Sequence, residues 1–516
     1  MPYKKFRFIT GLILLLSLNI AAQNVTTLDR SSPEKEGVSS AGILNFLNAA
    51  NASKHEFHSF IFLRHGKVIS EGWWNPYKAN LKHTMYSCSK SFTATAIGFA
   101  VTEKKLSLSD KVVSFFPNEL PDTISENLKV LTVKDVLSMS DGQEPDPTFT
   151  VVTKDSNWVR SFLATPIIYK PGTKFLYNSL GTYMLSAIVQ KVTGEKVIDY
   201  LRPRLFSPLG ITDIDWEVDP KGINTGGWGL RIRTEDLAKF GQLFLQKGKW
   251  NDKQVLPAAW VEEASTLKII QNPELPQAKR DSSDWEQGYC YQMWRCRNNA
   301  YRGDGAYGQF IIVMPDQDAV IAITAETPDM QDELNLVWKY LLPAIKKKAL
   351  PANNNAGLAL RQKLVSLALP LPVKTDTSFN NAVSGKAFAI TGNDSHITNM
   401  VFKFSDNTCT LALKTDTAQY LLDFKSGAWQ NGETTKPGPY LIATAKANHV
   451  GLPPFKIAGS YNWKDAQTLE LILRYVERPH TEKMVCHFDG NKISVDLVSS
   501  ISPDQKKTIE GTQAAN

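Results

Sequence analysis

The strongest constraint on the fold is a change in sequence pattern about two thirds of the way along the chain. Before residue 350, amphipathic helical stretches such as 179–202 and 234–248 alternate with strand-like stretches. Beyond residue 375, short alternating strands follow one another, separated by turn residues. A polar stretch at 351–357, Pro-Ala-Asn-Asn-Asn-Ala-Gly, marks the start of a linker. We therefore expect a mixed α/β domain at 24–350, a linker at 351–374, an all-β barrel or sandwich at 375–502 and a polar tail at 503–516.

Composition places the chain among folded globular proteins. Of its 516 residues, 42% are hydrophobic and 21% are charged, which excludes a disordered, collagen-like or coiled-coil chain. The formal net charge of +7 falls to +4 if Lys4, Lys5 and Arg7 are removed with the segment described next. Because the remaining basic residues are interspersed with acids, we expect no nucleic-acid partner.

The first 23 residues have the layout of a secretory signal peptide. A basic start is followed by apolar residues from about Phe8 to Ile20 and by the small residues Ala21 and Ala22. The apolar part is short for a membrane span, and no later stretch reaches the ~18 apolar residues that a spanning helix needs. An uncleaved N-terminal anchor is the alternative interpretation. We expect an exported protein, periplasmic or secreted, with no stable membrane insertion after cleavage.

Five cysteines in an exported chain leave at least one outside any intramolecular disulfide. Cys290 and Cys296 are close in sequence, and Cys409 and Cys486 share the C-terminal region, so each pair is a candidate disulfide. Five buried thiols are an equally good interpretation. In either case Cys88 is expected to stay unpaired.

The pattern Ser-x-x-Lys occurs three times, and only its surroundings separate the occurrences. The pairs are Ser32 and Lys35, Ser87 and Lys90, and Ser265 and Lys268. The first lies in a polar stretch and the third in a stretch that suggests an exposed helix. Only Ser87 opens a long apolar helix, Ser-Cys-Ser-Lys-Ser-Phe-Thr-Ala-Thr-Ala, and we therefore single out this pair.

The spacing of this pair has a chemical meaning. Residues three and four apart share one face of a helix, so Ser87, Lys90 and Ser91 should project to the same side. A serine in the first helical turn lies beside free backbone N–H groups that favour a developing oxyanion. If Lys90 is buried, its pKa falls and its neutral amine can accept the serine proton. The alternative is a helix-capping serine and a solvated lysine.

Two further segments carry candidate functional groups. In Tyr177-Asn178-Ser179, a tyrosine beside a lysine ammonium can relay or accept a proton, although simple packing is the alternative. Residues 302–309, Arg-Gly-Asp-Gly-Ala-Tyr-Gly-Gln, lead into the apolar strand Phe-Ile-Ile-Val-Met. Glycines at the start of a strand permit close approach of a ligand, although most such sequences are turns.

The three motifs in this order resemble the serine β-lactamase and penicillin-binding-protein superfamily. The tyrosine motif follows Ser87 by about 90 residues, and the glycine-rich strand follows by about 125 more. The segments Gly-Trp-Gly-Leu-Arg-Ile-Arg-Thr-Glu-Asp-Leu and Gly-Tyr-Cys-Tyr-Gln-Met-Trp are similar to the class C-like branch, which includes 6-aminohexanoate-dimer hydrolases and family VIII-type esterases. The resemblance covers roughly residues 30–350.

The resemblance implies a fold and a set of roles. The fold is an α/β sandwich, an antiparallel sheet flanked by helices, beside a helical subdomain. Ser87 would be the acylated nucleophile, Lys90 its general base and Tyr177 a partner in proton transfer. The amides of Ser87 and Ala306 would form the oxyanion hole. The other candidates are the strand residues Gly305, Gly308 and Gln309 and the substrate-binding residues Ser179, Asn178 and Arg302.

One departure from the superfamily pattern bears on the substrate. The third motif is commonly Lys-Thr-Gly, whose cation binds a substrate carboxylate, and here Gly303-Asp304-Gly305 takes its place. Neighbouring strand residues point to opposite faces, so Arg302 need not replace the lysine. The pattern favours a neutral ester or amide over a β-lactam or a D-Ala-D-Ala peptide.

Other chemistries have less support in the sequence. There is no Gly-x-Ser-x-Gly motif, and the eight histidines all lie before residue 84 or after residue 395. His55 and His58 are expected on a polar helix face rather than at a metal, and no metal-ligand cluster is apparent. We expect an exported serine hydrolase without metal or organic cofactor, which acts on a small-molecule or peptide substrate. The alternative is a non-catalytic receptor or scaffold that binds cell-wall peptide or glycan, and association with the cell wall fits both.

Overall fold

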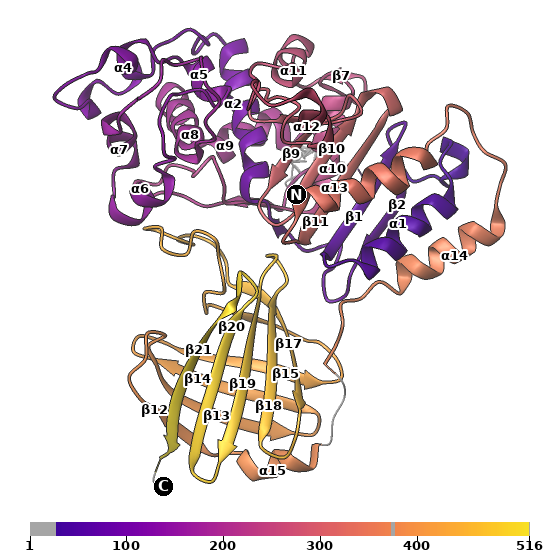
Figure 1. The fold of residues 1–516 in the computed structure, drawn as a ribbon, viewed down its shortest axis with the longest axis vertical. Helices are drawn as coiled ribbons and strands as arrows, with labels where there is room; N and C mark the ends of the chain where they lie inside the picture. Colours follow the sequence, from indigo (N-terminus) through magenta and orange to yellow (C-terminus); the bar gives the residue numbers. More distant parts are fainter. Residues whose placement is uncertain (1–26, 373–376, 515–516) are drawn as a thin grey trace, which may run out of the picture.

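The computed structural model describes residues 27–372 and 377–514, and the predicted signal peptide lies outside them. Figure 1 shows an α/β part with a helical subdomain at its side, and a β-barrel below it. Within the described residues, no helix combines the length and apolar character needed to cross a bilayer.

A six-stranded antiparallel sheet forms the centre of the α/β part. Its strand order is β2-β1-β11-β10-β9-β8. The bounds are β1 Glu56–Arg64, β2 Lys67–Trp73, β8 Trp294–Arg295, β9 Tyr301–Gly305, β10 Gln309–Met314 and β11 Ala319–Glu326. Hairpin turns join β1 to β2 around residues 65–67 and β10 to β11 around residues 315–318.

Both faces of this sheet are buried, which explains the unbroken apolar run in β1. Phe60 and Phe62 pack in one core cluster, while Ile61 and Leu63 pack in the other. Helices α1 (Ser40–Ala52), α13 (Met330–Leu336) and α14 (Asn354–Val365) belong to the first side. Helices α2 (Ser89–Thr102) and α10 (Thr234–Leu245) cover the second. Two helical layers around one sheet are the α/β sandwich that the sequence predicted.

The helical subdomain lies beside α2. Its helices are α3 Val112–Phe115, α4 Glu126–Val130, α5 Val133–Leu137, α6 Thr148–Lys154, α7 Trp158–Ala164, α8 Ser179–Thr193 and α9 Val197–Leu201. A small sheet of β3 (His83–Thr84), β4 (Asp215–Trp216) and β5 (Leu230–Ile232) leads into α2. The domain also contains two short helices, α11 Ala258–Ser265 and α12 Gln277–Ser282, and two short paired strands, β6 Lys249–Trp250 and β7 Lys253–Gln254.

The C-terminal domain is a β-barrel, one of the two architectures predicted. Ten strands follow the order β15-β14-β13-β12-β21-β20-β19-β18-β17-β16, and pairing of β15 with β17 closes the sheet. The bounds are β12 Ala387–Ile390, β13 Ile397–Ser405, β14 Thr408–Thr415, β15 Gln419–Ser426, β16 Gln430–Thr434, β17 Phe455–Trp463, β18 Thr468–Tyr475, β19 Thr481–Asp489, β20 Lys492–Ser499 and β21 Ser502–Gln513; the short helix α15 is Asn380–Val383. Alternate residues of β14, Cys409, Leu411 and Leu413, are buried in the interior, as the period of a strand requires.

Two segments differ from the sequence interpretation. Helix α14 lies inside the expected linker, because Asn353 caps its first turn and Leu360 is buried against the α1 side of the sheet. Strand β21 lies in the expected polar tail, since its polar side chains face outward while Ile509 is buried. The sequence interpretation of both segments depended on their polar composition. The exposed face of a helix and the outer surface of a barrel are also polar, so composition does not separate them from a loop.

All five cysteines are free, buried thiols. This is the second of the two interpretations that the sequence left open, and neither candidate disulfide is formed. The Cys88 thiol donates a hydrogen bond to the carbonyl oxygen of Gln309 at 3.1 Å. Cys88 therefore ties the start of α2 to strand β10.

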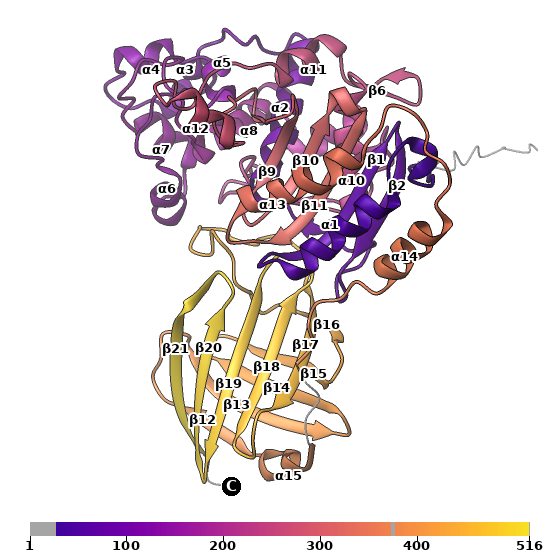
Figure 2. The ribbon, with the colours of Figure 1, turned by 45° about the vertical axis from the view of Figure 1, so that its right-hand side comes forward.

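The barrel lies below the α/β part (Figure 2), and polar contacts join the two. Arg474 of β18 forms an ion pair with Glu56 of β1, with Nη2 to Oε2 at 3.0 Å. Arg231 of β5 lies 3.3 Å from Glu477, which follows β18. The Tyr77 hydroxyl donates to the carbonyl of Arg478 at 2.9 Å. The barrel therefore contacts β1 and the small sheet of β3, β4 and β5 that leads into α2.

Candidate active site

Ser87 lies at the junction between β3 and α2. A short 3-10 helix, Tyr86–Cys88, precedes α2, and Tyr86 has a positive φ of 45°. The Ser89 hydroxyl donates to the carbonyl of Tyr86 at 2.6 Å and accepts from the amide of Leu230 at 3.1 Å, which fixes this turn. Ser87 is partly exposed, whereas Tyr86 and Cys88 are buried. The turn thus presents one hydroxyl group to a cavity.

Lys90 lies one helical turn beyond Ser87, as its spacing predicted. Its Nζ donates to Ser87 Oγ at 3.1 Å, to Ser179 Oγ at 3.0 Å and to the carbonyl of Gly227 at 2.7 Å. Burial lowers the pKa of Lys90 from 10.5 to about 7, although Asp146 and Asp304 oppose this shift. Near neutral pH a large fraction of this amine is therefore unprotonated and able to accept the Ser87 proton.

Gly227 allows the third of these contacts. A Cβ at this position would lie 2.7 Å from the carbonyl oxygen of Ser179 and 3.5 Å from Lys90 Nζ. A side chain would push the backbone away from the amine. This glycine is a site residue that the sequence motifs did not reveal.

Tyr177 is the third residue next to Ser87 in the site. It lines the same cavity as Ser87, and Lys90 Nζ lies 4.9 Å from the centre of its ring. Trp294 stacks on the ring at 5.8 Å. Burial raises the pKa of Tyr177 well above 10, with a further contribution from Asp304. Tyr177 therefore remains a neutral phenol near neutral pH.

The residues that follow Tyr177 have different positions. Ser179 lines the cavity and accepts the Lys90 hydrogen bond. Asn178 does not face the cavity as a substrate-binding residue would. It is fully buried, caps α8 through the amide of Gly181 and donates to Asp141 and Gln143. Asn178 is thus a positioning residue that holds Tyr177 and Ser179 at the start of α8.

The glycine-rich strand passes directly beside the Ser87 turn. A Cβ on Gly305 would lie 2.0 Å from the carbonyl oxygen of Met85, so only glycine fits here. Ala306, the next residue, lines the cavity. Gln309 is buried, and its amide donates to the carbonyls of Ala306 and Ala325 at 3.1 and 2.8 Å. Gln309 therefore braces the strand, and Gly308, with φ of 90°, forms its turn.

Arg302 was expected as a substrate-binding residue, and the structure contradicts this. Its side chain is fully buried and pairs with Asp304 at 2.9 Å. The guanidinium lies 4.2 Å from the ring centre of Trp285 and donates to the carbonyl of Asp284 at 2.8 Å. Strand β9 directs the Arg302 side chain into the protein interior, behind the residues that line the cavity. The charge of its guanidinium is paired with Asp304.

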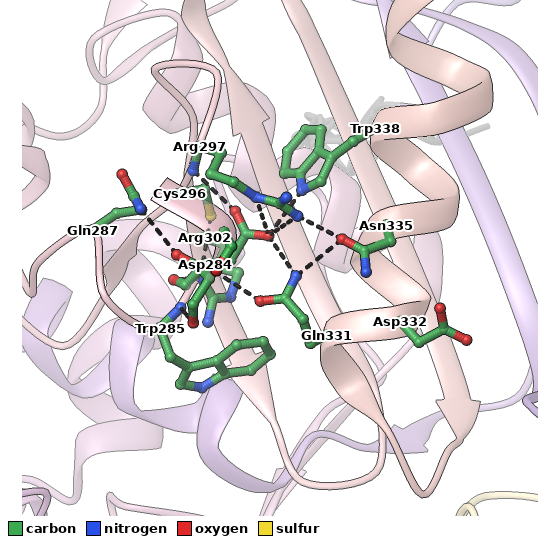
Figure 3. Close-up of polar contacts among 12 residues, drawn as sticks. Asp284, Trp285, Gln287, Cys296, Arg297, Arg302, Gln331, Asp332, Asn335 and Trp338 are labelled. Carbon is green, nitrogen blue, oxygen red and sulfur yellow. Dashed lines mark hydrogen bonds and ion pairs between the residues drawn. The ribbon is translucent and has the colours of Figure 1, made fainter. Parts of the chain in front are cut away.

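A network around Asp284 supports this wall (Figure 3). The Asp284 carboxylate accepts hydrogen bonds from the side chains of Arg297, Gln331 and Trp338, and from the Arg297 amide. Burial alone would raise the pKa of Asp284, but these donors lower it. The network fixes the backbone next to Trp285. Its members come from separate segments, so no local sequence pattern indicates this network.

These elements enclose a cavity of about 450 Å³. It is lined by Tyr86, Ser87, Asp146, Thr148, Phe149, Tyr177, Ser179, Gly227, Trp228, Trp285, Trp294, Asp304, Ala306, Met330, Leu441 and Ile442. Its walls are mainly aromatic and aliphatic, with the Ser87 hydroxyl among a few polar groups. Leu441 and Ile442 belong to the C-terminal domain, so this domain contributes to the cavity wall.

No histidine is among these lining residues. His55 and His58 lie before and within β1 and are buried, so the expected polar helix face is wrong. His55 contacts Thr327 and Asp332, and His58 contacts His83 and Glu56. Across residues 27–372 and 377–514, no cluster of three or more His, Cys, Asp or Glu side chains is arranged to hold a metal ion.

The site combines three features: a Ser-x-x-Lys motif at the start of a helix, a tyrosine at the start of α8 and a glycine-rich strand. They lie between an α/β sandwich and a helical subdomain. This combination defines a serine hydrolase of the penicillin-binding-protein type. The chain belongs to the Beta-lactamase family, whose sequence model matches residues 58–342.

Similar proteins are named as hydrolases. The chain is 27% identical over 290 residues to the "6-aminohexanoate-dimer hydrolase" of Paenarthrobacter ureafaciens, covering 52% of this chain and 73% of that protein. It is 23% identical over 231 residues to the "Putative D-alanyl-D-alanine carboxypeptidase" of Escherichia coli K12, covering 39% of this chain and only about half, 53%, of that protein. The solved "Putative 6-aminohexanoate-dimer hydrolase from Bacillus anthracis" has a TM-score of 0.50 at 19% identity, covers 63% of this chain and 89% of its own, and supports the fold.

Proposed function

We propose that this protein hydrolyses small neutral esters or amides through an acyl-enzyme on Ser87. The observation that carries the proposal is the position of Lys90. Its amine, with a pKa of about 7, lies within hydrogen-bond distance of both Ser87 and Ser179. A buried lysine with this pKa beside a serine hydroxyl is suited to general-base catalysis.

In the first step, Ser87 Oγ attacks the carbonyl carbon of the substrate and its proton moves to Lys90 Nζ. The carbonyl oxygen becomes an oxyanion, and the amides of Ser87 and Ala306, two residues that line the cavity, would stabilise it. The tetrahedral intermediate then collapses, and the bond to the leaving group breaks. Tyr177 passes a proton to the departing alcohol or amine and is replenished from Lys90. Water releases the acyl group by the same steps in reverse, with the proton on Ser87 at the end.

The cavity lining favours a neutral reacting group. Lys90 is the one lysine or arginine among the lining residues, and it is committed to proton transfer. Of the two lining aspartates, Asp304 is paired with Arg302, and Asp146 would disfavour an anionic substrate. Cleavage of an amide bond also fits the name of the related 6-aminohexanoate-dimer hydrolase. With the signal peptide predicted at 1–23, the reaction would take place in the periplasm or outside the cell.

Covalent labelling tests the proposal directly. Intact-mass analysis after incubation with a serine-directed fluorophosphonate should show one adduct on the full chain and none on Ser87→Ala. Ser265→Ala is a matched control, because Ser265 belongs to another Ser-x-x-Lys pattern but donates to the carbonyl of Val261 on α11. It should be labelled like the original chain. Absence of an adduct on the folded original chain would overturn the hydrolase proposal in favour of a binding protein.

The pH dependence of turnover should follow Lys90. Because its amine accepts a proton only when neutral, kcat/KM for p-nitrophenyl acetate should rise with pH up to about 7 and then level off. Below that value it should fall by about tenfold per pH unit. Asp141, whose pKa burial also raises to about 7, titrates in the same range. Asp141→Asn should keep the same acid limb; loss of the limb in this variant, or a flat profile from pH 5 to 8, would contradict the role of Lys90.

A further inference from the structure

The loop between β16 and β17, residues 435–454, leaves the barrel and reaches the catalytic domain. We call it the barrel loop. Figure 1 shows it above the barrel, near α6. The other functional residues of the cavity lie before residue 331, so this loop is the contribution of the C-terminal domain to the site.

One anchor of the barrel loop is beside the nucleophile. The Tyr440 hydroxyl donates to Glu217 Oε1 at 2.7 Å, and its ring stacks on Tyr86 at 5.4 Å. The amide of Leu441 approaches the Tyr86 hydroxyl at 3.5 Å. Tyr440 is almost completely buried, so the first half of the loop is fixed against the residue that precedes Ser87.

A second anchor holds the loop to the helical subdomain. The amide of Lys446 donates to the carbonyl of Val152 in α6 at 2.9 Å. The hydroxyls of Thr444 and Thr153 are 3.0 Å apart. Between the two anchors, Leu441 and Ile442 face the cavity, and Ile442 is only 5% exposed. The barrel loop therefore spans the cavity from the Ser87 turn to α6.

The side chains that the barrel loop places in the cavity are apolar. Leu441 and Ile442 line the same cavity as Phe149 of α6 and Met330 of α13. Burial of an apolar group of the ligand against such a wall favours binding until the space is filled. A cavity of about 450 Å³ suits a small molecule.

We propose that the barrel loop determines substrate specificity, with Leu441 and Ile442 as the residues that limit the length of an apolar group next to the scissile bond. The inference rests on the proposed hydrolase function and adds the substrate class: short esters or amides with an apolar chain on one side. Long chains would collide with these two side chains.

Chain-length preference tests this role. Two substrate series are compared. p-Nitrophenyl esters with acyl groups of two to eight carbons lengthen the acyl side of the scissile bond. Alkyl acetates with alkyl groups of two to eight carbons lengthen the leaving group. The double variant Leu441→Ala with Ile442→Ala should raise the ratio of kcat/KM for eight carbons to that for two carbons by at least about tenfold in one series. Ile442→Trp should lower it. Val450→Ala is the matched control, because Val450 belongs to the same loop but is 58% exposed.

Fluorophosphonate labelling of the same variants separates the two proposals. If Ser87 is labelled and the esters are hydrolysed, but the ratio changes by less than twofold in both series, the barrel loop does not set specificity. If Ser87 of the original chain is not labelled, the hydrolase proposal itself fails. Circular dichroism of each variant checks that the loop changes have not unfolded the protein.

Discussion

Lys90→Ala should lower the rate of acylation of Ser87 by about 10³- to 10⁴-fold. The variant loses the base at 3.1 Å from Ser87 Oγ and leaves the hydroxyl at its ordinary, very high pKa. It also leaves Ser179 and the carbonyl of Gly227 without their common donor. Stopped-flow measurement of p-nitrophenol release, under single-turnover conditions, reports this step directly.

Lys268→Ala is the matched control for this prediction. Lys268 completes another Ser-x-x-Lys pattern, but its amine pairs with Glu263 at 2.9 Å and is remote from the cavity lining. Its loss should leave acylation within twofold of the original rate. Acylation of Lys90→Ala at more than a tenth of the original rate would show that another group accepts the proton.

Tyr177→Phe should have the second largest effect, and its size should depend on the leaving group. Removal of the hydroxyl takes away the proton relay at Ser87, while the stacking on Trp294 is kept. For an anilide, whose departing amine must be protonated, kcat should fall by about 10²- to 10³-fold. For a p-nitrophenyl ester, whose leaving group departs as an anion, the loss should be about tenfold or less.

Tyr289→Phe tests whether the loss is specific. Tyr289 is buried in the same aromatic cluster, 4.9 Å from Trp294, but it is not among the cavity-lining residues. This variant should affect both substrates equally and by little. Equal losses for anilide and ester in Tyr177→Phe would assign the phenol a positioning role instead.

Local sequence pattern was sufficient for the parts of the site that lie on one helix or one strand. The apolar residues after Ser87 separated this Ser-x-x-Lys from the other two, because burial of α2 is what brings Lys90 out of water. Gly305 was found for a similar reason, since a strand glycine marks close backbone approach. The alternation in β14 likewise predicted a β-domain.

The remaining residues depend on contacts that no local pattern records. Arg302 and Gln309 were placed in the site by their position in the motif, but strand geometry turns both side chains into the core. The Asp284 network and the barrel loop join segments that are far apart in the chain, so neither has a sequence signature. Only the tertiary structure shows which side chains meet.

The ion pair between Glu56 and Arg474 has a consequence for the order of events during folding. The two residues are 418 positions apart, and Glu56 belongs to the first strand of the catalytic sheet. Until β18 is in place, that carboxylate lacks its partner, and the cavity lacks Leu441 and Ile442. During synthesis, a nascent chain that lacks the barrel would therefore hold Ser87 and Lys90 in an unfinished site. If the proposed function is right, full activity would arise only after the barrel has been made.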